Sequence, residues 1–297
     1  MTPLVHLTEI DLINVTISEG TLNSLLSQCT TLEYLMMEGM SQCGRVHIRS
    51  PKLKVLSSCG RFDELFVEDA PNLEYVLGNF MNLRPVHLKI GHAPKLEFLG
   101  YLNTSLHLIE IIDTMIKKDE QHVQQPLMPC LKTLAVDVRY TTEGYIERFM
   151  QLLTLCPCLE TIYINSDTSV VQAAAPGSWK ALRSSLPSCI DNHLEKVAFE
   201  VYRGHEWQRE MAKFLHGRSR FLKTMEFHCM AVTVGAESSK PPSEEWVKKQ
   251  RELLCLDSRA SRDACFQFFK RMLVCNHQYI CHHEWYQRKY YDNLYKV

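Results

Sequence analysis

One short phrase recurs along most of this chain and limits its fold more than any other feature. The phrase has the form L-x-x-L-x-L. It is clearest in residues 53–77, LKVLSSCGRFDELFVEDAPNLEYVL, and it returns as CTTLEYLMM, APKLEFLGY, MPCLKTLAV and CPCLETIYI. Including two weaker copies and a degenerate first one, the copies are led by Leu7, Leu32, Leu53, Leu73, Leu96, Leu131, Leu159, Leu194 and Leu222. Successive leading leucines lie 20 to 35 residues apart.

These steps fall in or just above the leucine-rich-repeat range of about 20 to 29 residues. The last two apolar residues of each phrase alternate on a short strand that faces inward, and the first packs where the chain turns into that strand. One unit cannot bury this face alone, whereas stacked units can. The predicted fold is therefore an α/β leucine-rich-repeat solenoid, curved, with parallel strands on one face and helices, loops and further strands on the other.

Local patterns predict the other elements of each coil. Short β-patterned segments at 46–48, 65–67 and 86–90 precede turn signals such as Ser-Pro and Ala-Pro, so these coils should hold two strands each. Serine N-caps and apolar spacing predict helices over 18–29 and from 243, and apolar spacing alone predicts helices at 145–153 and about 205–217. Strands are expected at 194–202 and 222–229. Helical spacing of Ala264, Phe268 and Leu273 predicts one more helix.

Composition shifts divide the chain. We expect leucine-rich repeats at 1–114, a polar linker or insertion at 115–129, further repeats at 130–234, and C-terminal helices and a tail at 235–297. Leu73 and Leu96 should be buried. The leucines hold the stack together, so partner specificity should lie in variable strand-face residues, for which we name Glu64, Phe66 and Glu68.

Charge and cysteine usage narrow the functional classes. The chain has 33 basic and 34 acidic residues, for a formal charge of −1. It therefore lacks the excess positive charge that is typical of proteins that bind nucleic acid or an anionic membrane. It contains no apolar run near the roughly 18 residues of a membrane span, and its start does not resemble a signal peptide. The 12 cysteines are dispersed and are predicted to be reduced and mostly buried. We expect a cytoplasmic or nuclear protein.

No motif predicts an enzyme, a cofactor or a catalytic residue. The sequence lacks G-x-S-x-G, H-E-x-x-H and the P-loop pattern. The nearest approach to a zinc site is a group in the tail whose spacing does not suit structural zinc, so no metal is predicted. That group consists of Cys275, His277, Cys281, His282 and His283. Cys156 and Cys158 also lack C-x-x-C spacing.

Two further patterns can be interpreted either as purely structural or as functional. In the tail, Trp285, Tyr286, Arg288, Lys289, Tyr290 and Tyr291 interleave aromatic and cationic side chains as a nucleic-acid strip does, yet the neutral overall charge favours packing or partner contact. The slot after each leading leucine is charged, with mixed signs, and is predicted to be a solvated position beside the strand; the functional alternative is a row that keeps a partner in register. The slot holds Glu33, Lys54, Glu74, Glu97, Lys132, Glu160, Glu195 and Lys223.

The phrases SPKLKVL, ELFVEDAPNLEYVLG and APKLEFLGYL resemble the repeats of plant F-box/LRR-repeat proteins. The stretch from HLEKVAFEVYRGHEWQREMAKFLHGRSRFLKTMEF to SRASRDACFQF resembles the FBD-type C-terminal segment of that family. The resemblance implies the substrate receptor of an SCF-type ubiquitin ligase, which holds an unknown target protein. The family's F-box is missing before the repeats, so binding to a Skp-type adaptor is not expected. The alternative is a stand-alone repeat protein or a decoy that binds the same targets without ubiquitination.

Overall fold

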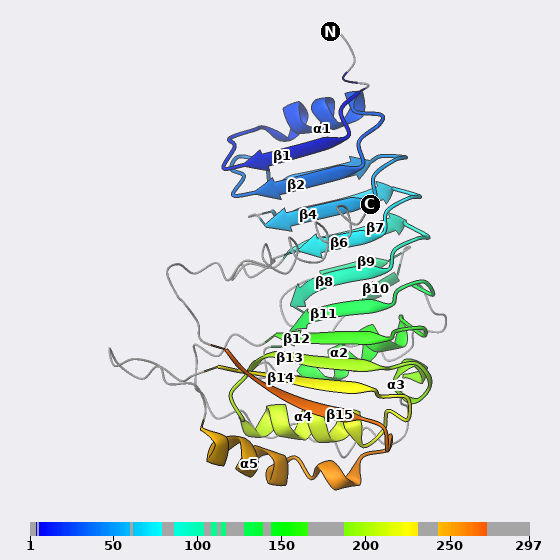
Figure 1. Cartoon of the computed structure of the whole chain (residues 1–297). Coiled ribbons are helices and arrows are strands. Elements are labelled where there is room, and N and C mark those ends of the chain that lie inside the picture. The colour runs from blue at the N-terminus through cyan, green and yellow to red at the C-terminus, as the bar shows by residue number, and fades with distance from the viewer. Residues whose placement is uncertain are drawn as a thin grey trace, which may run out of the picture.

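The computed structural model describes residues 4, 6–59, 62–78, 86–103, 108–111, 114–116, 128–138, 144–165, 187–230 and 243–271. Its dominant feature is a ten-stranded sheet whose neighbouring strands are all parallel, stacked in chain order (Figure 1). Its strands are β1 (Glu9–Ile13), β2 (Tyr34–Glu38), β4 (Val55–Cys59), β6 (Tyr75–Gly78), β8 (Phe98–Asn103), β11 (Thr133–Asp137), β12 (Thr161–Asn165), β13 (Lys196–Tyr202), β14 (Thr224–Met230) and β15 (Cys265–Arg271). The stack confirms the predicted leucine-rich-repeat solenoid.

A second, five-stranded sheet belongs to the first half of the chain. Its order is β10 (Thr114–Ile116), β9 (Leu108–Ile111), β7 (His87–His92), β5 (Glu64–Asp69) and β3 (Arg45–Arg49), with only the β10–β9 pair antiparallel. In Figure 1, β7, β9 and β10 lie behind the larger sheet. These strands confirm the prediction of two short strands per coil.

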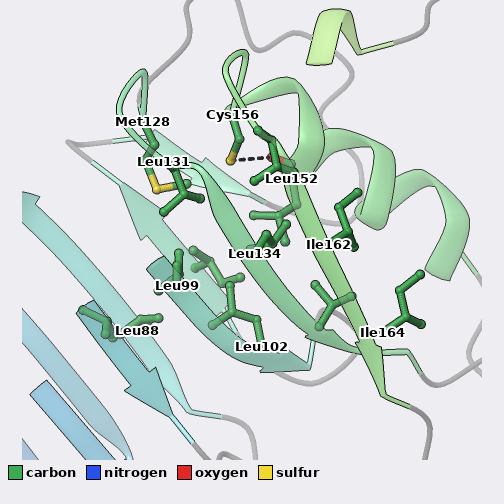
Figure 2. Packing of buried hydrophobic residues seen from close by; sticks show 14 of the residues in the cluster. Leu88, Leu99, Leu102, Met128, Leu131, Leu134, Leu152, Cys156, Ile162 and Ile164 are labelled. Carbon is green, nitrogen blue, oxygen red and sulfur yellow. Dashed lines mark hydrogen bonds between the residues drawn. The ribbon is translucent and has the colours of Figure 1, made fainter. Parts of the chain in front are cut away.

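The main core lies between the two sheets and, further along the chain, between the larger sheet and the helices. Eight of the nine leading leucines are buried, with exposed fractions of 3% or less. Leu73, at 0%, and Leu96, at 3%, confirm the predicted register. Leu7 is the exception at 39%, because no described coil precedes it. Figure 2 shows how Leu99, Leu134 and other inward side chains of successive strands meet in one continuous apolar layer.

Helices occupy the ends of the array and the second half. Their bounds are α1 (Glu19–Gln28), α2 (Tyr145–Thr154), α3 (Ser188–Asn192), α4 (Glu206–His216) and α5 (Glu244–Leu253), and a short 3-10 helix follows at Leu256–Ser258. The predicted caps are present, since the hydroxyls of Ser18 and Ser243 accept hydrogen bonds from the N–H groups of Thr21 and Trp246. The four helices expected at 18–29, 145–153, 205–217 and from 243 are confirmed as α1, α2, α4 and α5.

The helix predicted from Ala264 and Phe268 is wrong, because residues Cys265–Arg271 form strand β15. Even-numbered apolar positions fit alternation as well as a helical step, and aromatic residues favour strands. Phe268 packs face to face on Phe227 of β14, with ring centroids 4.6 Å apart, whereas Phe269 is exposed. Pairing with β14 therefore decides that this segment is a strand and not a helix. Leu273 lies outside the described residues.

The charged slot after each leading leucine is a solvated position, as predicted. From Lys54 to Lys223, the N–H group of each slot residue donates to the carbonyl of the preceding one at 2.8–3.0 Å. Three neighbouring pairs of opposite sign form half-exposed ion pairs: Lys54–Glu33, Lys132–Glu97 and Lys223–Glu195. Exposed pairs of this kind contribute at most about 1 kcal/mol each, so these three ion pairs add little to the stability of the fold.

Most of the predicted linker at 115–129 lies outside the described residues, although β10 extends to Ile116. Beyond residue 271 nothing is described. The zinc-like group of the tail, Cys275, His277, Cys281, His282 and His283, therefore lies outside the described residues, as do Trp285 to Tyr291.

Candidate partner-binding surfaces

The three residues predicted to bind a partner lie on β5, in the five-stranded sheet. Glu64, Phe66 and Glu68 are partly exposed and alternate with Leu65 and Val67, which are both 0% exposed. The alternation arises because successive strand residues point to opposite faces. The structure thus places the three residues together on the outer face of this sheet, the side turned away from the core.

Phe66 is the centre of a row that crosses four strands. The register pairs it with His47 on β3 and Lys89 on β7, and pairs Lys89 with Glu110 on β9. The His47 ring stacks on Phe66 with centroids 4.8 Å apart and planes 4° apart, and Lys89 Nζ lies 5.9 Å from the centroid. A cation over a phenyl ring at this distance is attracted to it. An aromatic side chain is therefore held in one orientation on an otherwise polar surface.

Charge alternates from strand to strand across this outer face. His87 of β7 lies between two acidic strands, with Nε2 2.9 Å from Glu110 and Nδ1 3.6 Å from Glu64. On the other side of β5, His47 Nε2 lies 2.9 Å from Glu68. Each outward carboxylate of this group thus has a cationic or imidazole neighbour on the next strand. The surface, which we call the Phe66 face, comprises His47, Glu64, Phe66, Glu68, His87, Lys89 and Glu110.

The larger sheet carries a second candidate surface, which sequence reasoning missed. Its outer face holds two small apolar clusters that are separate from the main core. We call this surface the aromatic face; it comprises Tyr34, Met36, Val55, Tyr75, Leu77, Phe98, Tyr101, Ala135 and Tyr163. A signal was present, because the second residue after the leading leucine is aromatic in LEYL, LEYV and LEFL. That position points outward from the strand.

Small residues shape the middle of the aromatic face. A Cβ on Gly100 would meet the Cβ of Ala135 at 2.4 Å, so β8 and β11 approach each other closely here. Tyr101 clusters with Ala135, and its hydroxyl donates to Glu200 of β13 at 2.6 Å. Because strand β12 separates β11 from β13, the tyrosine reaches across the surface of the sheet rather than standing upright on it.

A polar group borders the aromatic face on β13 and β14. Lys196 Nζ lies 2.6 Å from Glu226 and 5.7 Å from the ring of Tyr163, and His228 Nε2 lies 3.2 Å from Glu226. Burial alone would raise the pKa of Glu226, but the hydrogen bonds from Lys196 and His228 outweigh it and hold the pKa below its usual value. Glu226 is therefore a stable negative charge beside the aromatic residues.

The described residues contain no group of three or more His, Cys, Asp or Glu side chains arranged to hold a metal ion. The ten described cysteines are free, and five of them are buried. Cys156 is one of these, and its thiol donates to the carbonyl of Leu152 at 3.4 Å (Figure 2), whereas Cys158 is exposed. Burial raises the pKa of the thiol of Cys189 to about 12, so at neutral pH it is a packed thiol and not a nucleophile.

Comparison with known families agrees with this geometry. The repeats of the family described as "FBD-associated F-box protein At5g56370, LRR repeats" match residues 1–164, more than half of the chain. The chain belongs to this family. A second match, to the FBD region, covers residues 183–227. Searches of curated proteins and of solved structures found no match.

The two family matches correspond to two parts of the solenoid. In this member of the FBD-associated F-box family, the repeat match contains the whole five-stranded sheet and all nine residues of the aromatic face. The FBD match contains α3, β13, α4 and the first part of β14. Both families are interaction modules, so the chain has a role in protein–protein interaction. None of the described helices has the length and apolar character needed to cross a membrane.

The FBD region of this family member contains a buried histidine at the end of α4. His216 is 0% exposed, its Nε2–H donates to the carbonyl of Leu254 at 3.1 Å, and its ring meets the edge of Phe266. Burial lowers the pKa of His216, and the charges of Lys213 and Arg259 act in the same direction, against the raising effect of the hydrogen bond to Leu254. The folded state thus disfavours a proton that the unfolded state accepts.

We expect acid to destabilise the fold through His216. The unfolded imidazole has a pKa near 6.5, and the folded value is lower. Protonation of His216 therefore contributes about nothing to the free energy of unfolding at pH 7.5. As the pH falls through about 6.5, it lowers the free energy of unfolding by at most about 1.4 kcal/mol per pH unit. Thermal unfolding at pH 7.5 and 5.5 should show a smaller pH effect in His216→Gln than in the wild type. His193→Gln, at an exposed site, is the matched control, and equal pH effects in all three proteins would contradict the prediction.

Proposed function

We propose that this chain is a protein-binding module that holds a target on the Phe66 face. The observation that supports the proposal is the row of His47, Phe66, Lys89 and Glu110, in which a partly exposed aromatic ring is fixed among alternating charges. Aromatic side chains are enriched among residues that dominate binding energies, and complementary charges on the partner set register and association rate. On this chain, Glu64 and Glu68 lie on either side of Phe66 and supply two negative charges that a partner with basic side chains would complement.

We further propose that the module is the target-holding part of an SCF-type E3 ubiquitin ligase. The family relationship supports this assignment, because the matched repeats are those of an FBD-associated F-box protein. The matched residues are repeats and FBD region, so docking to a Skp-type adaptor is not among the functions that we assign to this chain. No enzymatic activity, cofactor, nucleic acid or membrane is assigned to it, and its expected compartment is the cytoplasm or nucleus.

The first test is capture of the target by the full chain. Immobilised wild-type protein, Phe66→Ala and Phe221→Ala are incubated with the same cell extract, and captured proteins are quantified by mass spectrometry. Phe221 is 55% exposed and lies outside both candidate faces, so it is the matched control. We expect one or more proteins to be lost about tenfold with Phe66→Ala, as for a hot-spot residue worth about 1.4 kcal/mol or more, and retained with Phe221→Ala.

Other outcomes of this test separate the parts of the proposal. If Phe66→Ala captures the same proteins as wild type, the Phe66 face is not the binding surface. If the wild-type chain efficiently recovers a Skp-type adaptor, the statement on adaptor docking is wrong. Overexpression of the chain with an F-box fused before the repeats then tests the ligase assignment, because a target-holding part that is connected to the adaptor should accelerate target turnover, whereas the chain alone should not. A stabilised target would identify the chain as a decoy instead.

A further inference from the structure

Two exposed cysteines occupy the same place in two neighbouring coils. Cys130 lies in the segment MPCL, at 128–131, and Cys158 lies in the segment CPCL, at 156–159. Each segment is a turn with proline in its second position, closed by a hydrogen bond of 3.3 Å from the N–H of its leucine to the carbonyl of its first residue. Because proline fixes one backbone angle of each turn, both cysteines are held at the third position of the same rigid turn. Both side chains are exposed.

Hydrogen bonds on both sides of the cysteines hold the two turns next to each other. Before the cysteines, the N–H of Met128 donates to the carbonyl of Leu155 at 3.1 Å, and after them the N–H of Glu160 donates to the carbonyl of Lys132 at 2.9 Å. Figure 2 shows the turn of Met128 beside the turn that contains Cys156. Strands β11 and β12, which follow, pair residues 28 positions apart, the same separation as that of the two cysteines. The turns are therefore stacked in register.

Two earlier coils show that side chains at this position contact the neighbouring coil. Asn72 and Lys95 are the third residues of the turns at 70–73 and 93–96, which are closed by the same kind of hydrogen bond. Lys95 Nζ donates to Asn72 Oδ1 at 2.7 Å, and Asn72 Nδ2 donates to the carbonyl of Pro51 at 2.7 Å. The third turn position thus directs its side chain along the stack of coils.

The spacing of the coils suits a disulfide bond between these positions. Neighbouring strands of a sheet lie about 4.8 Å apart. The Cα atoms of two bonded cysteines lie about 4.4 to 6.8 Å apart. Because Cys130 and Cys158 occupy equivalent positions of stacked turns, their two sulfur atoms can bond with little displacement of either backbone.

We propose that Cys130 and Cys158 form a reversible disulfide bond that joins the coil of β11 to the coil of β12 under oxidising conditions. The co-reactant is a low-molecular-weight disulfide such as oxidised glutathione. The thiolate of one cysteine attacks it, forms a mixed disulfide and releases one glutathione thiolate; the thiolate of the other cysteine attacks the protein sulfur of that mixed disulfide and releases the second. The two protons lost by the cysteines go to the two glutathione thiolates. Two cysteines are thus oxidised while one glutathione disulfide is reduced to two thiols.

The reaction is selective for the exposed pair. Cys156 and Cys189 belong to the same coils but are both 0% exposed. Burial raises the pKa of Cys156 well above its usual value and that of Cys189 to about 12. Because the thiolate is the attacking form, these two thiols stay protonated and out of contact with glutathione.

The bond would close a loop of the chain that contains β11 and α2. A disulfide stabilises a fold chiefly by restricting the unfolded chain, so oxidation should oppose the separation of these two coils. Disulfides of proteins in compartments kept reducing by glutathione are mostly transient and redox-sensing, which fits the expected cytoplasm or nucleus. Neither cysteine belongs to the Phe66 face or the aromatic face, so the inference does not depend on the proposed function.

Oxidation of the purified full chain in a series of glutathione buffers tests the proposal. Remaining thiols are blocked, the protein is digested without reduction, and linked peptides are identified by mass spectrometry. We expect Cys130 and Cys158 to be linked within one molecule at a yield at least about tenfold above links from either residue to Cys255, which is also exposed, because neighbouring thiols react at a high effective concentration. Dithiothreitol should restore both thiols.

Two variants assign the bond to its residues. Cys158→Ser should abolish the link to Cys130, whereas Cys255→Ser, the matched control at another exposed thiol, should retain it. The proposal is overturned if each cysteine of the turn pair ends with its own glutathione, if Cys130 links instead to Cys156, or if the links join two copies of the chain.

The melting temperature tests whether the bond holds the two coils together. Oxidised wild type and Cys255→Ser should melt at least about 3 °C above their reduced forms. Cys158→Ser, whose fold is checked by circular dichroism, should melt at the same temperature in both states. A bond without this rise, or a rise that Cys158→Ser retains, would contradict the joining of the coils. The capture test with Phe66→Ala is run under reducing conditions and is unaffected by either result, so the two proposals fail separately.

Discussion

Leu73→Ala should lower the free energy of unfolding by about 2 to 5 kcal/mol, as for other fully buried leucines. Leu73 is 0% exposed and belongs to the main core, and its N–H donates to the carbonyl of Ala70 at 3.0 Å in the turn that leads into β6. Truncation removes apolar contact and leaves a cavity, because the backbone on both sides is fixed in the sheets. Urea unfolding followed by circular dichroism measures the change.

Leu253→Ala is the matched control for this substitution. Leu253 ends α5 and is 37% exposed, so the same change should shift stability by no more than about 0.5 kcal/mol. Leu96→Ala, at 3% exposure in the next coil, should repeat the large effect of Leu73→Ala. A loss below about 0.5 kcal/mol at Leu73 would contradict the register of the repeats, because such small values belong to surface sites.

The leading leucines could be predicted from the sequence to be buried, because every coil has the same inward apolar face to bury. Every unit must bury one inward face against its neighbours, so Leu53 and Leu159 occupy equivalent places although more than a hundred residues separate them. Caps could be found for a similar reason, since Ser18 and Ser243 satisfy exposed N–H groups within their own turn. Where the deciding interaction is local or repeated, sequence reasoning succeeds.

Elements whose structure depends on non-local pairing were not predictable in the same way. The segment with Phe266 and Phe268 fits a strand or a helix until β14 is beside it, and the contact with Phe227 decides between them. Glu64, Phe66 and Glu68 were correctly expected on a strand face. Their sequence does not reveal that this strand belongs to a second sheet, because the partners come from coils about 20 residues before and after.

The aromatic face was missed because the leucines carry the repeat signal. Two residues separate the first two leucines of L-x-x-L-x-L, and the second of them, Tyr34 in LEYL and Phe98 in LEFL, is an unspecified position of the motif. The parallel register then places Tyr34, Val55, Tyr75 and Phe98 side by side across four strands. A period of about one coil in the aromatic residues themselves was the available signal.

Gly91→Ala should lower the free energy of unfolding by about 1 to 3 kcal/mol, the usual cost of adding volume to a packed site. Gly91 lies in β7, where a Cβ would come within 2.6 Å of the carbonyl oxygen of Glu68 and 3.3 Å of that of Val67. Both atoms belong to the backbone of β5 and cannot rotate away. The strand that carries Phe66 must therefore move, so the substitution should also reduce target capture by the Phe66 face.

Gly20→Ala is the matched control, and it separates a steric cause from a general effect of replacing glycine. Gly20 lies in α1 with no heavy atom within 4 Å of the added methyl group, and alanine there reduces the entropy of the unfolded chain. We expect a gain of about 0.5 to 1 kcal/mol from Gly20→Ala, opposite in sign to Gly91→Ala. If urea unfolding instead shows both substitutions to be stabilising, β5 and β7 do not approach each other as closely as the structure indicates. The packing that fixes Glu68 and Phe66 on their face would then need to be reassigned.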